Sequence, residues 1–208
     1  TSFENIPEGL INALVSTEDV RFYRHPGIDF RGLMRVLKGI LTGDTSSGGG
    51  STISQQLAKM LFPREEFSNP AELALRKFRE WVIAVKLERS YTKEEIITMY
   101  LNKYDFLNLA VGIKTAANVY FNCEPDSLQL HQSAMLVGMA KNSALYNPVR
   151  RPELTLQRRN VVLNQMRKYD FITRHQYDSL KMLPLGLDFH RVDFKRGLAP
   201  YFREYLRI

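Results

Sequence analysis

Apolar residues recur at helical spacing along most of the chain. Three sets show this pattern: Ile11, Leu14 and Val15; Phe30, Leu33, Met34, Leu37 and Leu41; Ala74, Phe78, Trp81, Val82 and Val85. Residues three and four apart share one face of an α-helix, whereas a half-buried strand needs strict alternation, which is nearly absent here. The pattern predicts a mainly α-helical domain.

Polar residues mark where several helices begin. The signals are Asn69 before Pro70, Thr92 with Glu95, and Thr173 with Gln176. The first pair suits an N-cap followed by proline, and the other two have the spacing of capping boxes. Between Thr42 and Gly50 the chain is rich in glycine and serine, which predicts a loop leading into a helix that begins near Thr52.

Length and charge narrow the class of protein. The 208 residues, of which 44% are hydrophobic, suffice for one core, so we expect a single domain over residues 1–208 that can have two lobes. The net charge of +7 favours an anionic partner: nucleic acid, an anionic lipid surface or a phosphorylated substrate. No recognised nucleic-acid-binding motif accompanies the charge, so nucleic acid is not an expected partner.

The number of cysteines, the spacing of histidines and the length of the apolar runs argue against a zinc site and against a membrane-spanning segment. Cys123 stands alone, and the four histidines lack the spacing of a zinc site, so no bound metal is expected from these residues. No apolar run is long enough to span a bilayer, and no signal peptide opens the chain. The first residue is Thr1, so a membrane anchor preceding this segment is compatible with the sequence.

Three short segments carry candidate chemistry. In the first, the adjacent carboxylates Glu18 and Asp19 are followed by Phe22 and His25, and one carboxylate is a candidate general base. Considered alone, two such carboxylates are more often surface charges.

The second segment groups hydroxyl, amide and ammonium side chains on the first turns of a helix, from Ser51 and Thr52 to Gln56 and Lys59. This face could bind sugar or phosphate, or it could simply cap the helix. In the third segment, Arg76 and Lys77 lie beside Glu80 on one helix face, which an ordinary surface ion-pair cluster would explain as well.

Taken together and in order, these segments resemble the glycosyltransferase domain of class A penicillin-binding proteins and of their monofunctional relatives. The family pattern is Glu-Asp-x-x-Phe-x-x-His-x-Gly, Gly-x-Ser-Thr-Ile-x-Gln-Gln, Arg-Lys-x-x-Glu and Tyr-Leu-Asn. It corresponds here to Glu18–Gly27, Gly49–Gln56, Arg76–Glu80 and Tyr100–Asn102, and the resemblance extends from Ile6 to Met166. The chain departs from the family at Met60, Asp105–Asn108, Gln132 and Ala140–Asn142, away from Glu18 and Glu80.

The resemblance implies a lysozyme-like helical domain with a small membrane-facing lobe. It places the protein on the extracytoplasmic face of the bacterial inner membrane, held by an N-terminal anchor outside this segment. The corresponding region of family members enters the outer leaflet, here residues 60–70 with Met60, Leu61, Phe62, Pro63 and Phe67. The alternative is that these side chains cover the interior of the domain itself.

The resemblance also implies a reaction. Members polymerise a lipid-linked disaccharide, lipid II, onto a growing glycan strand, and they release a lipid diphosphate with inversion. Glu18 would be the general base and Glu80 the second essential carboxylate. The expected substrate-binding residues are Asp19, Phe22, His25, Ser51, Thr52, Gln56, Lys59, Arg76 and Lys77. No cofactor is required, although a divalent cation, Mg or Mn, could assist at the diphosphate.

Two other functions are compatible with a helical domain of this kind. One is a lysozyme-like lytic glycosidase, which needs a protonated acid in an apolar pocket and no diphosphate site. The other is a catalytically silent glycan-binding scaffold, which the departures near Asp105 allow. The cations Lys59, Arg76 and Lys77 favour the glycosyltransferase over the glycosidase.

Overall fold

The computed structural model of the protein describes residues 1–43, 50–62 and 69–190. The interior of the glycine-rich loop, 44–49, lies outside the described residues, as do residues 63–68, with Pro63 and Phe67 of the predicted membrane segment, and 191–208.

The described residues are mainly helical and include no β-strand, which confirms the predicted fold class. The α-helices are α1 (Glu8–Glu18), α2 (Phe30–Thr42), α3 (Ile53–Leu61), α4 (Pro70–Ser90), α5 (Lys93–Lys103), α6 (Ile113–Phe121), α7 (Leu130–Ala140), α8 (Pro152–Lys168) and α9 (Arg174–Leu180). Short 3-10 helices occur at Phe3–Asn5, Phe22–Arg24 and Pro125–Ser127.

The predicted helix starts are confirmed. Asn69 caps α4 by accepting a hydrogen bond from the Glu72 N–H, and capping boxes open α5 and α9 at Thr92 and Thr173. Thr52 caps α3 by accepting from the Gln55 N–H. Each of these bonds satisfies an N–H group that the helix itself leaves without a partner.

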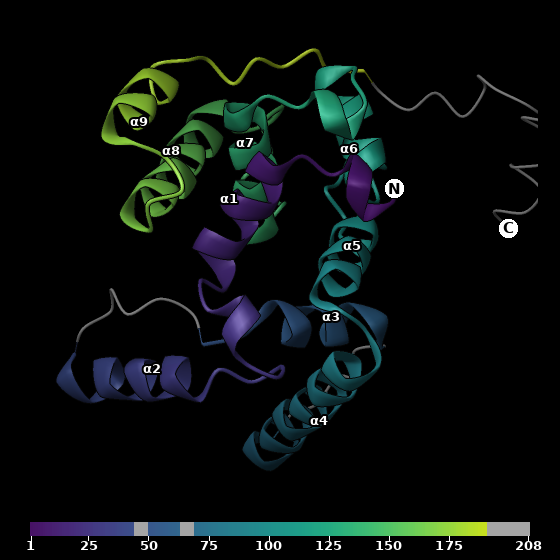
Figure 1. The fold of residues 1–208 in the computed structure, drawn as a ribbon, viewed down its shortest axis with the longest axis vertical. Coiled ribbons are helices and arrows are strands. Elements are labelled where there is room, and N and C mark those ends of the chain that lie inside the picture. Colours follow the sequence, from purple (N-terminus) through teal and green to yellow (C-terminus); the bar gives the residue numbers. More distant parts are fainter. Residues whose placement is uncertain (44–49, 63–68, 191–208) are drawn as a thin grey trace, which may run out of the picture.

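The helices form two parts joined by a continuous core (Figure 1). In the upper part α1 packs against α7 and α8, and in the lower part α3 packs against α4 and α5. Leu10 and Leu14 of α1, Leu57 of α3, and Ile96 and Ile97 of α5 are all fully buried. Helix α2 extends sideways below α1 (Figure 1). Helix α1 ends and helix α3 begins between the two parts, so these two termini are the natural place for a site.

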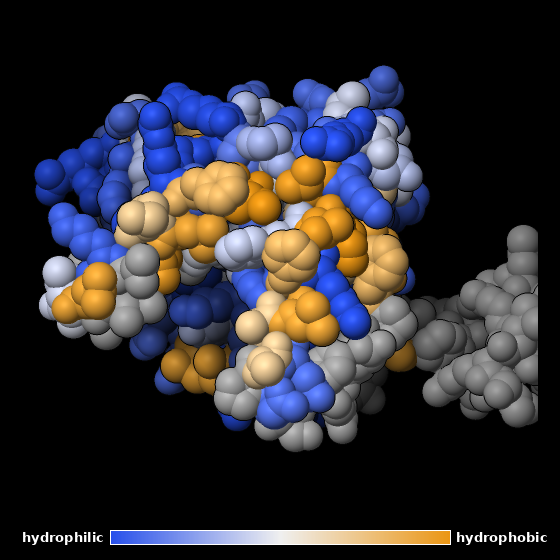
Figure 2. Space-filling view, turned by 90° about the horizontal axis from the view of Figure 1, so that it is seen from below, coloured by the Kyte–Doolittle hydropathy of each residue, from blue (hydrophilic) through white to orange (hydrophobic). Residues whose placement is uncertain are grey.

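Apolar residues of α2 and α4 face away from this core. Phe30 and Met34 of α2 are each 65% exposed, and Phe78 and Val82 of α4 are 60% and 40% exposed. Figure 2, which looks at the lower part from below, shows apolar side chains gathered on this face among charged ones. No helix within the described ranges is long and apolar enough to cross a bilayer. The apolar spacing thus predicted both helices correctly. The other described residues, however, do not cover the apolar faces of these two helices.

One buried cation fixes the C-terminal part of the described chain. Arg159 on α8 is fully buried, and its guanidinium donates hydrogen bonds to the carbonyl oxygens of Lys181, Leu183 and Pro184 at 2.7–3.0 Å. It also donates to Asn160 Oδ1. A buried guanidinium is tolerated only when its donors are satisfied, so this cluster holds the segment after α9 against α8.

We predict that Arg159→Met lowers the free energy of unfolding by about 3 kcal/mol, because it removes the hydrogen bonds that the buried guanidinium donates to three backbone carbonyl groups. Urea denaturation followed by circular dichroism measures the change. Arg167→Met on the same helix is the control: its guanidinium lies nearer the surface, bonded to Asn164, and its loss costs under about 1 kcal/mol. Equal losses in the two variants would contradict this account of Arg159.

Candidate functional site

A cleft of about 550 Å³ opens where α1 ends and α3 begins. Its lining comes from the end of α1, from α2, from the start of α3 and from one face of α8. Among the lining residues are Thr17, Glu18, Asp19, Gly32, Arg35, Gly50, Ser51, Thr52, Gln56, Lys141, Arg158, Val161, Gln165, Lys168 and Tyr169. The structure thus brings Glu18, Asp19, Ser51, Thr52 and Gln56, predicted from separate segments, to one cavity.

Glu18 is the last residue of α1, and its side chain is 15% exposed. The Gln56 Nε2 group donates to Glu18 Oε2 at 2.9 Å, and the Arg158 guanidinium lies 3.8 Å from Glu18 Oε1. A carboxylate held at both oxygens at the edge of a cleft is well placed to accept a proton from a bound hydroxyl group.

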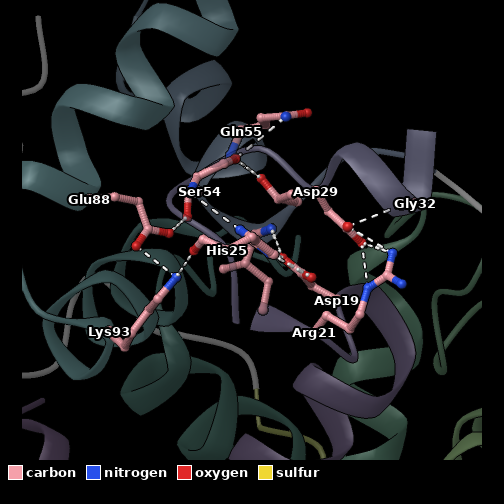
Figure 3. Close-up of polar contacts among 12 residues, drawn as sticks. Asp19, Arg21, His25, Asp29, Gly32, Ser54, Gln55, Glu88 and Lys93 are labelled. Carbon is pink, nitrogen blue, oxygen red and sulfur yellow. Dashed lines mark hydrogen bonds and ion pairs between the residues drawn. The ribbon is translucent and has the colours of Figure 1, made fainter. Parts of the chain in front are cut away.

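Asp19 has a different role from its neighbour. Its carboxylate is buried, lies 3.0 Å from His25 Nε2 and accepts a hydrogen bond from the Ile53 N–H at the start of α3 (Figure 3). The Gly27 N–H donates to His25 Nδ1, so Nε2 carries the proton that is shared with Asp19. Asp19 and His25 therefore hold the end of α1, the following loop and α3 together.

Phe22 does not line the cleft. It is fully buried, and the Lys93 ammonium lies 4.3 Å from the centre of its ring. Lys93 also donates to the His25 carbonyl at 2.7 Å and pairs with Glu88, which accepts a hydrogen bond from Ser54 (Figure 3). The prediction that Phe22 binds substrate is thus corrected: its side chain is fully buried, and it packs the loop that follows Glu18.

Thr52 joins the same loop to α3. Its hydroxyl group donates to the Gly27 carbonyl at 2.6 Å while it caps the helix. Gly27 has φ +94°, and a Cβ atom there would lie 2.8 Å from the Ala84 carbonyl oxygen. Glycine is required at this position because both the left-handed backbone and the close approach of α4 exclude a side chain.

Asp29 fixes the start of α2. The Arg21 guanidinium binds both of its carboxylate oxygens, and the Gly32 N–H donates to Oδ1 at 3.0 Å (Figure 3). Burial tends to raise the pKa of Asp29, but the hydrogen bonds from Arg21 and Gly32 outweigh it and hold the pKa below its ordinary value. Through this pair, α2 is tied to the loop that follows Glu18.

A second set of charged side chains lies beside the cleft, on α3 and α4. Glu80 is 8% exposed, and its carboxylate faces three cations: Lys77 Nζ at 3.0 Å, Lys59 Nζ at 3.7 Å and Arg76 Nε at 4.0 Å. Lys77 also donates to Ser51 Oγ at 3.1 Å. These four residues do not line the cleft itself, but they border it through Ser51. We call Lys59, Arg76, Lys77 and Glu80 the cation cluster.

The cation cluster does not fit a divalent metal held by the protein. Three positive side chains surround its carboxylate, and a metal ion there would be repelled by them. Within the described part of the chain, no three His, Cys, Asp or Glu side chains are grouped as metal ligands. A divalent cation at this place would need its oxygen ligands from a bound diphosphate.

The departures from the family pattern have simple structural consequences. Leu107, Asn108 and Leu109 all have left-handed backbones, with φ of +63°, +51° and +65°. Such values cost about 1 kcal/mol for a leucine, so this segment has a strained backbone. Gln132 completes a capping box with Gln129, a role that glutamate and glutamine fill equally.

The sequence interpretation missed the wall of the cleft that α8 supplies. Arg158, Val161, Gln165 and Lys168 recur at three- and four-residue spacing and therefore share one face of the helix. That spacing was visible in the sequence, but nothing local relates it to Glu18, which is far away along the chain. Arg35 of α2 was missed for the same reason.

The fold and the site define a helical domain with a carboxylate in a cleft and a group of cations beside it. The model of the family described as transglycosylase matches residues 1–167. Penicillin-binding protein 1A of Escherichia coli (strain K12) is 35% identical over 206 residues, 99% of this chain and 24% of that protein, and penicillin-binding protein 1A of Aquifex aeolicus (strain VF5) is 40% identical over 99% of this chain and 27% of that protein.

The chain belongs to the transglycosylase family, as the resemblance implied. It spans about a quarter of the length of these relatives. The crystal structure of penicillin-binding protein 1A from Haemophilus influenzae is 25% identical, with a TM-score of 0.46 over 74% of this chain and 18% of that chain.

Proposed function

We propose that this chain polymerises lipid II into glycan strands by an inverting, general-base mechanism. The observation that carries the proposal is the position of Glu18: its carboxylate lies in the cleft, and Ser51 of the same cleft is bonded to the cation cluster. A base for the attacking hydroxyl group and cations for the departing diphosphate are the two elements that this transfer needs.

In the proposed reaction the 4-hydroxyl group of lipid II attacks the anomeric carbon of the growing strand. Glu18 takes the hydroxyl proton as the new carbon–oxygen bond forms. Base catalysis of this kind contributes about 10²- to 10⁴-fold. The bond from the anomeric carbon to the diphosphate breaks, and its electron pair leaves with the lipid diphosphate. Attack from the face opposite the leaving group inverts the anomeric carbon.

Negative charge develops on the diphosphate oxygens as that bond breaks. Lys77, Lys59 and Arg76 supply positive charge next to Ser51, and charge-assisted hydrogen bonds to phosphate are among the strongest that side chains make. Glu80 lies among these three cations, and this arrangement suits a carboxylate that orients them rather than one that donates a proton.

The lipid of the substrate stays in the membrane, so the domain must lie at its surface. The exposed apolar residues of α2 and α4, with Leu61 and Phe62 at the end of α3, form a face suited to the outer leaflet. Met60 is partly buried against the core, so less of its side chain is exposed on this face. These exposed side chains support a wider membrane contact than residues 60–70. The family resemblance implies that this contact is at the extracytoplasmic side of the inner membrane.

Glu18→Gln is expected to abolish polymerisation of lipid II in detergent micelles, to below a few per cent of the wild-type rate, because the amide cannot accept the proton. The amide oxygen can still accept from Gln56, so the melting temperature should stay close to that of the wild type. Glu8→Gln, at the exposed start of the same helix, is the matched control and should polymerise normally. Residual synthesis well above that level in Glu18→Gln would refute the role of the base.

Lys77→Met is expected to weaken binding of undecaprenyl diphosphate about tenfold or more, through loss of a charge-assisted hydrogen bond. Binding of a lipid-free glycan strand should change little. Lys86→Met, on the exposed side of the same helix, controls for the loss of one positive charge. If Lys77→Met weakened the binding of both ligands equally, the cation cluster would not be a diphosphate site.

The double variant Met34→Ser/Phe78→Ser is expected to bind vesicles of phosphatidylglycerol and phosphatidylethanolamine roughly 30-fold more weakly, since each side chain contributes roughly 1 kcal/mol on entering lipid. Phe171→Ser/Met182→Ser removes the same residue types from exposed positions outside α2 and α4, and should leave vesicle binding unchanged. Equal binding by the two double variants in a flotation assay would show that α2 and α4 do not contact the bilayer.

A further inference from the structure

A tyrosine hydroxyl group buried in the core reaches toward the catalytic carboxylate. Tyr100 lies on α5, is 1% exposed and packs within the main hydrophobic core. Its hydroxyl group donates to Gln56 Oε1 at 3.1 Å, across the contact between α5 and α3. The other end of the same amide, Gln56 Nε2, donates to Glu18 Oε2. Three helices are thus joined by a chain of two hydrogen bonds that ends in the cleft.

The direction of these two hydrogen bonds is fixed by the chemistry of the groups at the two ends, the Glu18 carboxylate and the Tyr100 phenol. Burial, with added effects from Glu18 and Tyr104, raises the pKa of Tyr100 well above its ordinary value, so the phenol keeps its proton. The Glu18 carboxylate can only accept, so the amide nitrogen of Gln56 faces it, and the amide oxygen then accepts from the protonated Tyr100 hydroxyl group. With the amide reversed, the nitrogen could donate to the phenol oxygen, but the amide oxygen would lie against the carboxylate and the bond to Glu18 would be lost. The Tyr100 bond therefore holds the amide in the one orientation that serves Glu18.

The orientation of Gln56 decides which oxygen of Glu18 is held and how the carboxylate is rotated. Gln56 holds Oε2, and on the other side Arg158 faces Oε1 at 3.8 Å. A base acts efficiently only when its free lone pair is directed at the proton that it takes, and small errors of placement are costly. We infer that Tyr100 is a positioning residue for Glu18 and acts through Gln56, an inference that rests on the proposed function.

The first test is Tyr100→Phe, which keeps the buried ring and removes only the hydroxyl group. The kcat of lipid II polymerisation by the full chain should fall about tenfold, because the base loses its alignment. The KM for lipid II should stay within about twofold, since Tyr100 is buried and does not line the cleft. A change confined to KM would overturn the inference.

Tyr104→Phe is the matched control. Tyr104 is stacked on Tyr100, with ring centres 5.9 Å apart, and its hydroxyl group donates to the carbonyl oxygens of Met139 and Ala140. Like Tyr100→Phe, this variant loses one tyrosine hydroxyl group from the interior. The lost group, however, is not bonded to Gln56 or Glu18. Its melting temperature should fall as much as that of Tyr100→Phe, while its kcat stays at the wild-type value. An equal loss of kcat in both variants would reduce Tyr100 to a structural role.

The route through Gln56 is tested by a double-mutant cycle. In a Gln56→Ala background, Tyr100→Phe should lower kcat by less than about twofold, because the group on which Tyr100 acts is gone. Independent, additive losses would overturn the inference. A wild-type chain that makes no polymer would instead refute the proposed function.

A second measurement does not depend on activity. The side-chain amide protons of Gln56 can be followed by NMR in uniformly ¹⁵N-labelled protein. In Tyr100→Phe these signals should shift and lose protection from exchange with water, because the amide is no longer held at its oxygen. In Tyr104→Phe they should be unchanged. Unchanged Gln56 signals in Tyr100→Phe would refute the inference whether or not polymer is made.

Discussion

The site depends on how the buried carboxylate of Asp19 is satisfied. A carboxylate removed from water costs several kcal/mol unless donors surround it, and here the donors are His25 and the first N–H of α3. These bonds fix the end of α1 against the start of α3. Because Glu18 precedes Asp19 directly, the same bonds deliver its side chain to the cleft, and Gln56 follows on the first turn of α3. Glu18, the proposed base, and its partner Gln56 are therefore placed by a neighbour whose own carboxylate is already bonded within the protein.

Helix positions could be predicted from the sequence because their signals are local. Capping residues such as Thr92 and Thr173 lie within one turn of the groups they satisfy, and the structure places both where the spacing indicated. The environment of a helix face is not local. Phe30 and Phe78 have the period of core residues, yet both are largely exposed. An apolar stripe has the same spacing whether it meets protein or lipid, so only the packing of the other helices distinguishes the two.

The site could be predicted in part, for a related reason. The motifs assigned Glu18, Ser51 and Gln56 to one site, but they could not separate residues that face the cleft from those that support them. Phe22 lies within the same short motif as Glu18, yet it is core. Arg158 contacts Glu18 from a helix far along the chain, a pairing that only the fold creates. Short motifs thus identify the region, and tertiary contacts assign the roles within it.

Helix α2 links the exposed apolar face of the lower part to the cleft. Gly32 and Arg35 line the cavity, whereas Phe30 and Met34 of the same helix are exposed on the lower part of the molecule. The start of α2 is held by the bonds of Asp29 to Arg21, which lies in the loop after Glu18. A lipid-linked substrate carries its diphosphate at the level of the membrane surface, so its charge would enter beside α2 and α4 while its sugars extend upward toward Glu18. The depth at which these helices sit in the leaflet would then set the height of the diphosphate relative to the base.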